Sequence, residues 1–141
     1  VGASYGGYAA AMAAVKTPDL FQCAISFAGV TNLKKLVSRS RRYTNSKFVK
    51  NQIGDDSDDL EARSPYYQAE KVKIPMLFLH GEDDRIVDVE QSRMMVDELQ
   101  DLDKPVEYIE FESGDHYLSI QRNRHAAFKA MDAFLKRHLA D

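Results

Sequence analysis

Several features that often decide the class of a protein are scarce in this sequence. One cysteine, Cys23, among 141 residues excludes an internal disulfide framework. No apolar stretch approaches the roughly 18 residues of a membrane span, and a net charge of −3 gives no reason to expect nucleic-acid binding. The four histidines are scattered without metal-ligand spacing, so we predict no metal and no other cofactor. Cys23 lies in the apolar run 23–27, where we expect a buried core thiol.

The remaining composition is that of a folded domain of ordinary size. Hydrophobic residues make up 44% of the chain and charged residues 29%. There is no internal repeat and no low-complexity segment. Basic residues cluster in one run only, and we expect it to coat a helix or lid surface rather than to bind a polyanion. This run consists of Lys34, Lys35, Arg39, Arg41 and Arg42.

Strand-like and helical patterns alternate along the chain. The predicted strands are 24–27, 74–80 and 106–111, and the predicted helices are 9–16, 89–99 and 123–139. Between 31 and 63 the chain is polar, with weak helical patches at 33–37 and 47–53 and an acid-capped turn of helix at 60–63. The alternation predicts an α/β fold, a parallel sheet flanked by helices. Functional groups in such sheets gather at the carboxyl ends of the strands.

Residues 2–6 read Gly-Ala-Ser-Tyr-Gly and match Gly-x-Ser-x-Gly, the turn that exposes a nucleophilic serine between a strand and a helix. In so sharp a turn we expect no room for a Cβ atom at Gly2 or Gly6. The alanine-rich helix that follows would aim its N-terminus at Ser4, which makes the backbone N–H of Tyr5 a candidate oxyanion donor. The alternative is a glycine-rich turn in which Ser4 only caps the helix.

A catalytic triad also needs an acid and a base. Asp83, Asp84 and Asp88 all follow the strongest strand and compete for the role of the acid, although an acidic loop of this kind can also be a solvated turn. Among the histidines, only His116 lies on a loop at the required edge of the sheet.

The other three histidines have simpler expected roles. His125 and His138 fall within the last helix, and His80 ends a strand, where we expect a structural hydrogen bond. The order serine, aspartate, histidine along the chain is that of the α/β-hydrolases.

Taken together, these stretches resemble the catalytic domain of the prolyl oligopeptidase family of serine peptidases, which includes dipeptidyl and acylaminoacyl peptidases. Residues 2–8 are similar to its elbow Gly-x-Ser-Tyr-Gly-Gly-Tyr, and residues 80–87 to its pattern His-Gly-x-x-Asp-x-x-Val, which selects Asp84 over Asp83. The family histidine falls on His116. The resemblance covers nearly the whole chain, although Tyr117 stands where a smaller residue is commoner and would narrow the mouth of the site.

The resemblance implies a serine-type peptidase that cleaves short peptides through an acyl-enzyme. Ser4 would be the nucleophile, His116 the base and Asp84 the orienting acid, with Tyr5 N–H in the oxyanion hole. Val30, Leu33 and Val87, together with Tyr5, would line an apolar or proline-binding pocket for the residue before the scissile bond. Two alternatives stay open, a carboxylesterase of the same fold and a non-catalytic interaction domain.

The resemblance further implies that residues 1–141 are the C-terminal part of such a catalytic domain, from the elbow to the last helix. In the family, earlier strands, a second oxyanion donor and a gating domain precede this part. We therefore expect the chain alone to be weakly active or inactive. We also expect an exposed sheet edge through which it could form a homo-oligomer.

Overall fold

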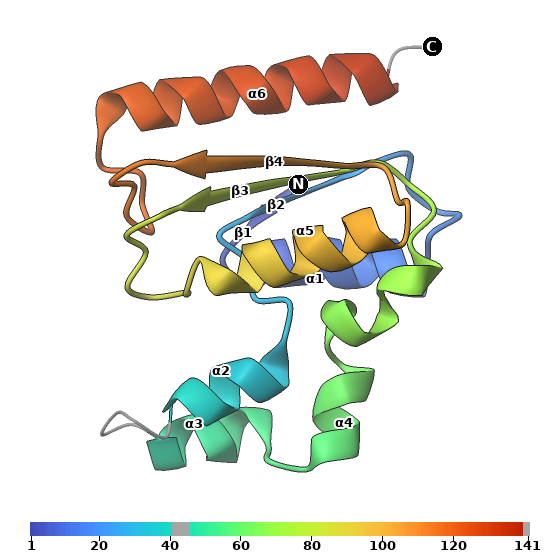
Figure 1. Cartoon of the computed structure of the whole chain (residues 1–141), viewed down its shortest axis with the longest axis vertical. Coiled ribbons are helices and arrows are strands. Elements are labelled where there is room, and N and C mark those ends of the chain that lie inside the picture. Colours follow the sequence, from blue (N-terminus) through green and yellow to red (C-terminus); the bar gives the residue numbers. More distant parts are fainter. Residues whose placement is uncertain (41–45, 140–141) are drawn as a thin grey trace.

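The computed structural model describes residues 1–40 and 46–139, and its centre is a four-stranded parallel sheet. The strands are β1 (Gly2–Ala3), β2 (Ala24–Phe27), β3 (Met76–Gly81) and β4 (Val106–Phe111). Their order in the sheet is their order in the sequence, and every pair is parallel. Helix α6 covers one face, and α1 and α5 cover the other (Figure 1). The predicted parallel sheet flanked by helices is confirmed.

The helices extend further than the local patterns indicated. They are α1 (Tyr5–Lys16), α2 (Leu33–Ser40), α3 (Ser46–Ile53), α4 (Ser57–Ala62), the 3₁₀ helix η1 (Pro65–Lys71), α5 (Glu90–Asp101) and α6 (Gln121–Leu139). The short helix expected at 60–63 begins earlier because the Asp56 carboxylate caps it, accepting the N–H of Asp59 at 2.8 Å. Helices α2, α3 and α4 lie together beyond the α1–α5 layer, away from α6 (Figure 1).

Strand β3 is buried along its whole length, because both faces of the sheet are covered. Met76 and Phe78 point to the side of α1 and α5, whereas Leu77 and Leu79 pack on the other side with Phe134 of α6. A continuous apolar run is what a central parallel strand requires, which is why this run was the clearest strand in the sequence.

The register of the sheet brings the predicted functional loops to one edge. Ala3, Phe27, Leu79 and Ile109 lie level across the four strands. Because the strands are parallel, the segments that follow them leave the sheet on the same side. Ser4, the loop 82–88 and the loop 112–120 therefore start from one edge, as expected for a site at the carboxyl ends of the strands.

The prediction of a buried core thiol at Cys23 is wrong. Cys23 is only partly buried, at the margin of the apolar cluster between the sheet and α6, since it precedes β2 rather than lying within it. This partial burial still raises the pKa of the thiol. Among the described helices, the 19-residue α6 included, none combines the length and hydropathy of a transmembrane segment.

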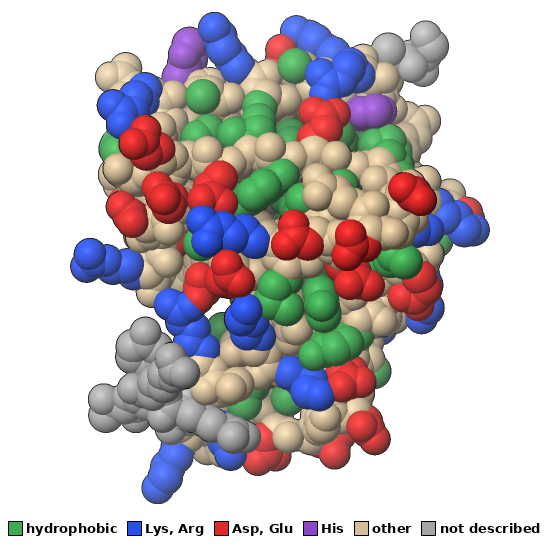
Figure 2. Space-filling view, in the orientation of Figure 1, with side chains coloured by type: hydrophobic (Ala, Val, Ile, Leu, Met, Phe, Trp, Pro, Cys, Tyr) green, Lys and Arg blue, Asp and Glu red, His purple; other side chains and the backbone are tan. Residues whose placement is uncertain are grey.

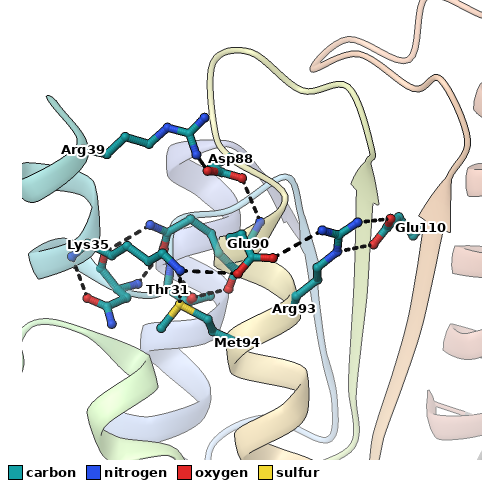
Figure 3. Close-up of polar contacts among 10 residues, drawn as sticks. Thr31, Lys35, Arg39, Asp88, Glu90, Arg93, Met94 and Glu110 are labelled. Carbon is teal, nitrogen blue, oxygen red and sulfur yellow. Dashed lines mark hydrogen bonds and ion pairs between the residues drawn. The ribbon is translucent and has the colours of Figure 1, made fainter. Parts of the chain in front are cut away.

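The basic run lies on α2 as far as the structure describes it, and Arg41 and Arg42 fall outside the described residues. Its other members pair with acids: Lys34 with Glu61 at 2.6 Å, Lys35 with Glu90 at 3.3 Å, and Arg39 with Asp88. Figure 3 shows the last two pairs, which join α2 to the start of α5. On the face shown in Figure 2, acidic and basic side chains are interspersed. This pairing supports the interpretation of a solvated surface.

Candidate active site

Ser4 lies in the sharp turn between β1 and α1. Its backbone angles, φ 55° and ψ −118°, fall outside the regions that non-glycine residues commonly adopt. Two backbone hydrogen bonds hold this conformation, from Ser4 N–H to the carbonyl of Phe27 at 2.9 Å and from Tyr8 N–H to the carbonyl of Ser4 at 3.1 Å. The side chain makes no capping hydrogen bond. Ser4 is therefore strained and free to present its hydroxyl, and does not act as a side-chain cap.

Of the two glycines expected to be sterically required in this turn, only Gly2 is. A Cβ on Gly2 would lie 2.0 Å from the carbonyl oxygen of Gly6, so Gly2 is sterically required, as predicted. The expectation for Gly6 is wrong, because a Cβ there would meet nothing within 4 Å. The second close approach is at Gly7, where a Cβ would lie 2.8 Å from Cα of Gly29 and 2.9 Å from the carbonyl oxygen of Phe27. Gly7 thus lets α1 pack directly on the segment after β2.

We expect Gly7→Ala to lower the free energy of unfolding by about 1–3 kcal/mol through overpacking against backbone. Gly6→Ala is the matched control in the same helix and should stabilise the protein by up to about 1 kcal/mol, because alanine is the better helix former. Urea unfolding of the two variants measures both effects. Equal free energies for the two variants would contradict the steric argument.

The acid loop and the histidine loop touch through their backbones. A Cβ on Gly81 would lie 2.3 Å from the carbonyl oxygen of Gly114. That same carbonyl accepts the N–H of Asp83 at 2.9 Å, and the carbonyl of Phe111 accepts the N–H of Glu82 at 3.0 Å. The two loops are therefore held at a fixed separation, which places Asp84 and His116 within reach of each other.

Asp84 is almost fully buried, with 6% of its surface exposed, and both carboxylate oxygens have donors. Oδ1 accepts the backbone N–H groups of Ile86 at 2.8 Å and Val87 at 2.9 Å, and Oδ2 lies 2.7 Å from Nδ1 of His116. Burial acts to raise the pKa of Asp84, but hydrogen bonds from His80, His116 and the two amides outweigh it and lower the pKa to about 2. Asp84 is thus ionised at neutral pH.

His116 connects Asp84 to Ser4. Its Nδ1 faces the Asp84 carboxylate, and its Nε2 lies 3.1 Å from Oγ of Ser4. Because an ionised carboxylate only accepts hydrogen bonds, Nδ1 carries the proton and Nε2 offers its lone pair to the serine hydroxyl. This arrangement can remove the hydroxyl proton and hold the resulting imidazolium.

The competing acids and histidines lie elsewhere. Asp83 is exposed, and Asp88 pairs with Arg39 and accepts the N–H of Glu90. His125 and His138 belong to α6, where the ring of His138 packs on Phe134 with 4.5 Å between ring centroids. Among the described residues, the structure brings Asp84 and His116 to Ser4.

The lowered pKa of Asp84 predicts a specific loss of stability in acid. Its folded value of about 2 lies below the ordinary value of 3.8, so the carboxylate contributes stability that is complete above the ordinary value and is lost as the pH falls through 2. The difference in free energy of unfolding between the native protein and Asp84→Asn should therefore shrink by roughly 2 kcal/mol from pH 5 to pH 2. Urea titrations at the two pH values measure it. A difference that does not change with pH would contradict the lowered pKa.

The predicted substrate-binding residues differ in burial: Tyr5 is exposed, Val30 is partly buried, and Leu33 and Val87 are buried. Tyr5 is the first residue of α1, so its N–H belongs to the first turn, whose N–H groups have no acceptor within the helix, and its side chain is 79% exposed. Val30 packs at the margin of an apolar cluster under α2, and Leu33 is buried within that cluster. Val87 is buried beside Asp84, where its backbone groups form hydrogen bonds. Their contact with a substrate stays a prediction.

A hollow of about 320 Å³ opens beside His116, and sequence reasoning had not assigned most of its lining. It is lined by Asp83, Arg85, Ile86, Asp115, His116 and Tyr117. The Tyr117 ring is 71% exposed and stands edge-on to the His116 ring, with 5.3 Å between centroids. The narrowing of the mouth of the site by Tyr117 stays a prediction. Arg85 and Ile86 directly follow the acid, and that adjacency was the clue available in the sequence.

Within 1–40 and 46–139, no group of three or more histidine, cysteine, aspartate or glutamate side chains is placed to hold a metal ion. A strained serine, a histidine base and a buried ionised aspartate form one hydrogen-bonded chain from three loops. This chain can generate a nucleophile for acyl transfer.

Comparison with known proteins gives consistent relatives. Dipeptidyl aminopeptidase BIII of Pseudoxanthomonas mexicana is 32% identical over 142 residues, which cover 96% of this chain and 21% of that protein. A solved puromycin-hydrolyzing peptidase of Mycobacterium tuberculosis superposes with a TM-score of 0.90 at 27% identity, covering 99% of this chain and 21% of that one. An acylaminoacyl peptidase of Pyrococcus horikoshii has a TM-score of 0.88 at 31% identity, covering 97% and 23%.

These similarities confirm the expected α/β-hydrolase fold. The chain spans about a fifth of the length of each of these three relatives. The model of the prolyl oligopeptidase family matches residues 1–141, the whole of the sequence. The chain therefore belongs to the prolyl oligopeptidase family of peptidases.

Proposed function

We propose that this protein is a serine peptidase in which Ser4, His116 and Asp84 form the catalytic triad. The observation that carries the proposal is the unbroken contact from Ser4 Oγ to His116 Nε2 at 3.1 Å and from His116 Nδ1 to Asp84 Oδ2 at 2.7 Å. Family membership supports it, since the relatives are named as peptidases. An interaction domain has no need of such a chain.

In the proposed reaction, Ser4 Oγ attacks the carbonyl carbon of the scissile peptide bond while His116 Nε2 takes the hydroxyl proton. Asp84 holds the imidazole ring and stabilises its charge. The oxyanion of the tetrahedral intermediate accepts the Tyr5 N–H at the positive end of α1. His116 then protonates the departing amine, leaving an acyl group on Ser4. Water, activated by the same histidine, releases this acyl group.

The proposed substrates are short peptides. The relatives are named as dipeptidyl and acylaminoacyl peptidases, which favours cleavage close to an N-terminus. The apolar side chains of Val30, Leu33 and Val87 would favour an apolar or proline-like residue before the scissile bond. Association of copies through the edge of β1, one of the two outer strands of the described sheet, also stays a prediction.

A panel of matched amide and ester substrates tests the reaction class in the naturally expressed protein. Dipeptidyl and acylaminoacyl p-nitroanilides should be hydrolysed, and kcat/KM should vary more with the acyl group among these amides than among the matched esters. The reason is that a peptidase uses contacts to the peptide to lower the barrier to amide cleavage. Hydrolysis of simple carboxylic esters with no cleavage of any amide would instead identify a carboxylesterase.

A further inference from the structure

His80 is a buried histidine that the triad chemistry above does not use. It lies near the end of β3 with none of its surface exposed. Its Nδ1 lies 2.7 Å from Oγ of Ser92 on α5, and its Nε2 lies 2.9 Å from the carbonyl oxygen of Val87 and 3.3 Å from Oδ2 of Asp84. The ring therefore joins helix α5 to the loop that carries the acid.

The partners of His80 decide its tautomer. Both atoms that face Nε2 are oxygens that can only accept, the carbonyl of Val87 and the ionised carboxylate of Asp84. Nε2 must therefore carry a proton. In the tautomer with its proton on Nε2, Nδ1 accepts a hydrogen bond from the hydroxyl of Ser92, whose position on α5 is set by the helix. The result is a donor with a fixed direction, aimed at the acid loop.

The contacts close a ring around the acid. Val87 donates its N–H to Oδ1 of Asp84 at 2.9 Å and accepts from His80 through its carbonyl. His80 in turn faces Oδ2, the oxygen that bonds His116. Oδ2 thus lies between two imidazole rings, and the turn that carries it is held through both backbone groups of Val87. The hydrogen bond from His80 also contributes to the lowered pKa of Asp84.

We infer that His80, oriented by Ser92, is a positioning residue that holds Asp84 in place against His116. The inference rests on the proposed function, because its catalytic effect is exerted through the triad. Without the Nε2 donor, the Val87 carbonyl would be buried without its partner, and Oδ2 of Asp84 would lose one of the two imidazole donors that fix its direction toward His116. A displacement of about 1 Å in a catalytic group can cost about 100-fold in rate.

Two substitutions separate positioning from simple packing. His80→Gln places an amide nitrogen where Nε2 stood and keeps the donor to Val87 and Asp84. His80→Asn places its amide where Nδ1 stood and keeps only the contact with Ser92. Both replace a ring with a smaller polar side chain, and asparagine leaves the larger void, so a purely structural role would lower kcat only in step with the lost stability. Unfolding midpoints of both variants give the packing cost directly.

We expect His80→Asn to lower kcat for a dipeptidyl p-nitroanilide by about 10- to 100-fold with little change in KM, and His80→Gln to restore most of the loss. A second readout, which does not need turnover, is the low-field NMR resonance of the proton in the hydrogen bond between His116 and Asp84. It should persist in the native protein and in His80→Gln, and shift upfield or vanish in His80→Asn. All measurements use the naturally expressed protein.

The inference would be overturned if the two variants lost kcat only in proportion to the fall in their unfolding midpoints. It would also be overturned if His80→Asn kept the native kcat and the native resonance. Ser92→Ala gives a milder independent measure, because it removes only the hydroxyl that orients the ring. We expect a smaller fall in kcat than in His80→Asn, and no fall would count against the inference. If the resonance responds as expected but the native protein cleaves no substrate, the positioning role stands and the proposed function fails.

Discussion

Replacing Ser4 with alanine should abolish covalent labelling by a fluorophosphonate probe and lower kcat by on the order of 10⁶-fold. The reason is that no other group can take the place of the hydroxyl in forming the acyl-enzyme. Ser4 has the strained backbone and the His116 Nε2 at 3.1 Å that such a nucleophile requires. Mass spectrometry of the labelled protein measures the first effect, and p-nitroanilide hydrolysis measures the second.

The matched control is Ser38→Ala, an exposed serine on α2 that should label and turn over as the native protein does. Labelling of the Ser4→Ala variant at the native rate would show that the nucleophile is another residue. Absence of label from a folded, naturally expressed native protein would move the assignment towards an interaction domain.

Replacing Asp84 with asparagine should lower kcat on the order of 10⁴-fold while leaving the fold intact. The asparagine amide can present an N–H to His116 Nδ1, and the ring then adopts the tautomer in which Nε2 carries the proton. In that tautomer the histidine cannot accept the proton of Ser4. The substitution also removes the charge that stabilises the imidazolium. Steady-state kinetics near neutral pH measure the loss.

Asp83→Asn is a sharp control for this experiment, because it removes the neighbouring carboxylate in the same loop. Asp83 is exposed and contributes its backbone N–H, not its side chain, to the contact with Gly114. Its activity should stay close to native. Comparable losses in the two variants would contradict the assignment of Asp84 as the orienting acid.

The strands and helices with long apolar patterns could be predicted closely from the sequence. The bounds of β2 and β4 are those expected, and α6 differs from expectation by two residues at its start. These elements have strong periodicity, and the sheet buries their apolar faces. The segment 31–63 was less predictable. Its helices α2 and α4 owe their stability to a shared cluster of Leu33, Val37 and Leu60, which local sequence does not reveal.

The sequence motif of the nucleophile turn predicted only part of its steric requirements. The pattern Gly-x-Ser-x-Gly correctly indicated a steric need at Gly2, but attributed the same need to Gly6. The structure places that need one residue later, at Gly7, because the close approach is to Gly29 on the segment after the neighbouring strand. The distance between residues 22 positions apart is a property of packing, and no local pattern encodes it.

The α/β class, the three motifs and their order follow from the sequence, since strand and turn propensities and the chemistry of serine, aspartate and histidine are local properties. The contact of Asp84 with His116, and the contacts of His80 with Asp84 and Ser92, are visible only in the folded chain. The contact between Asp84 and His116 joins two loops 32 residues apart in the chain. The parallel sheet creates it, because it brings the carboxyl ends of successive strands to one edge. The contact between His80 and Ser92 is closer in sequence and depends on the packing of α5 beside β3.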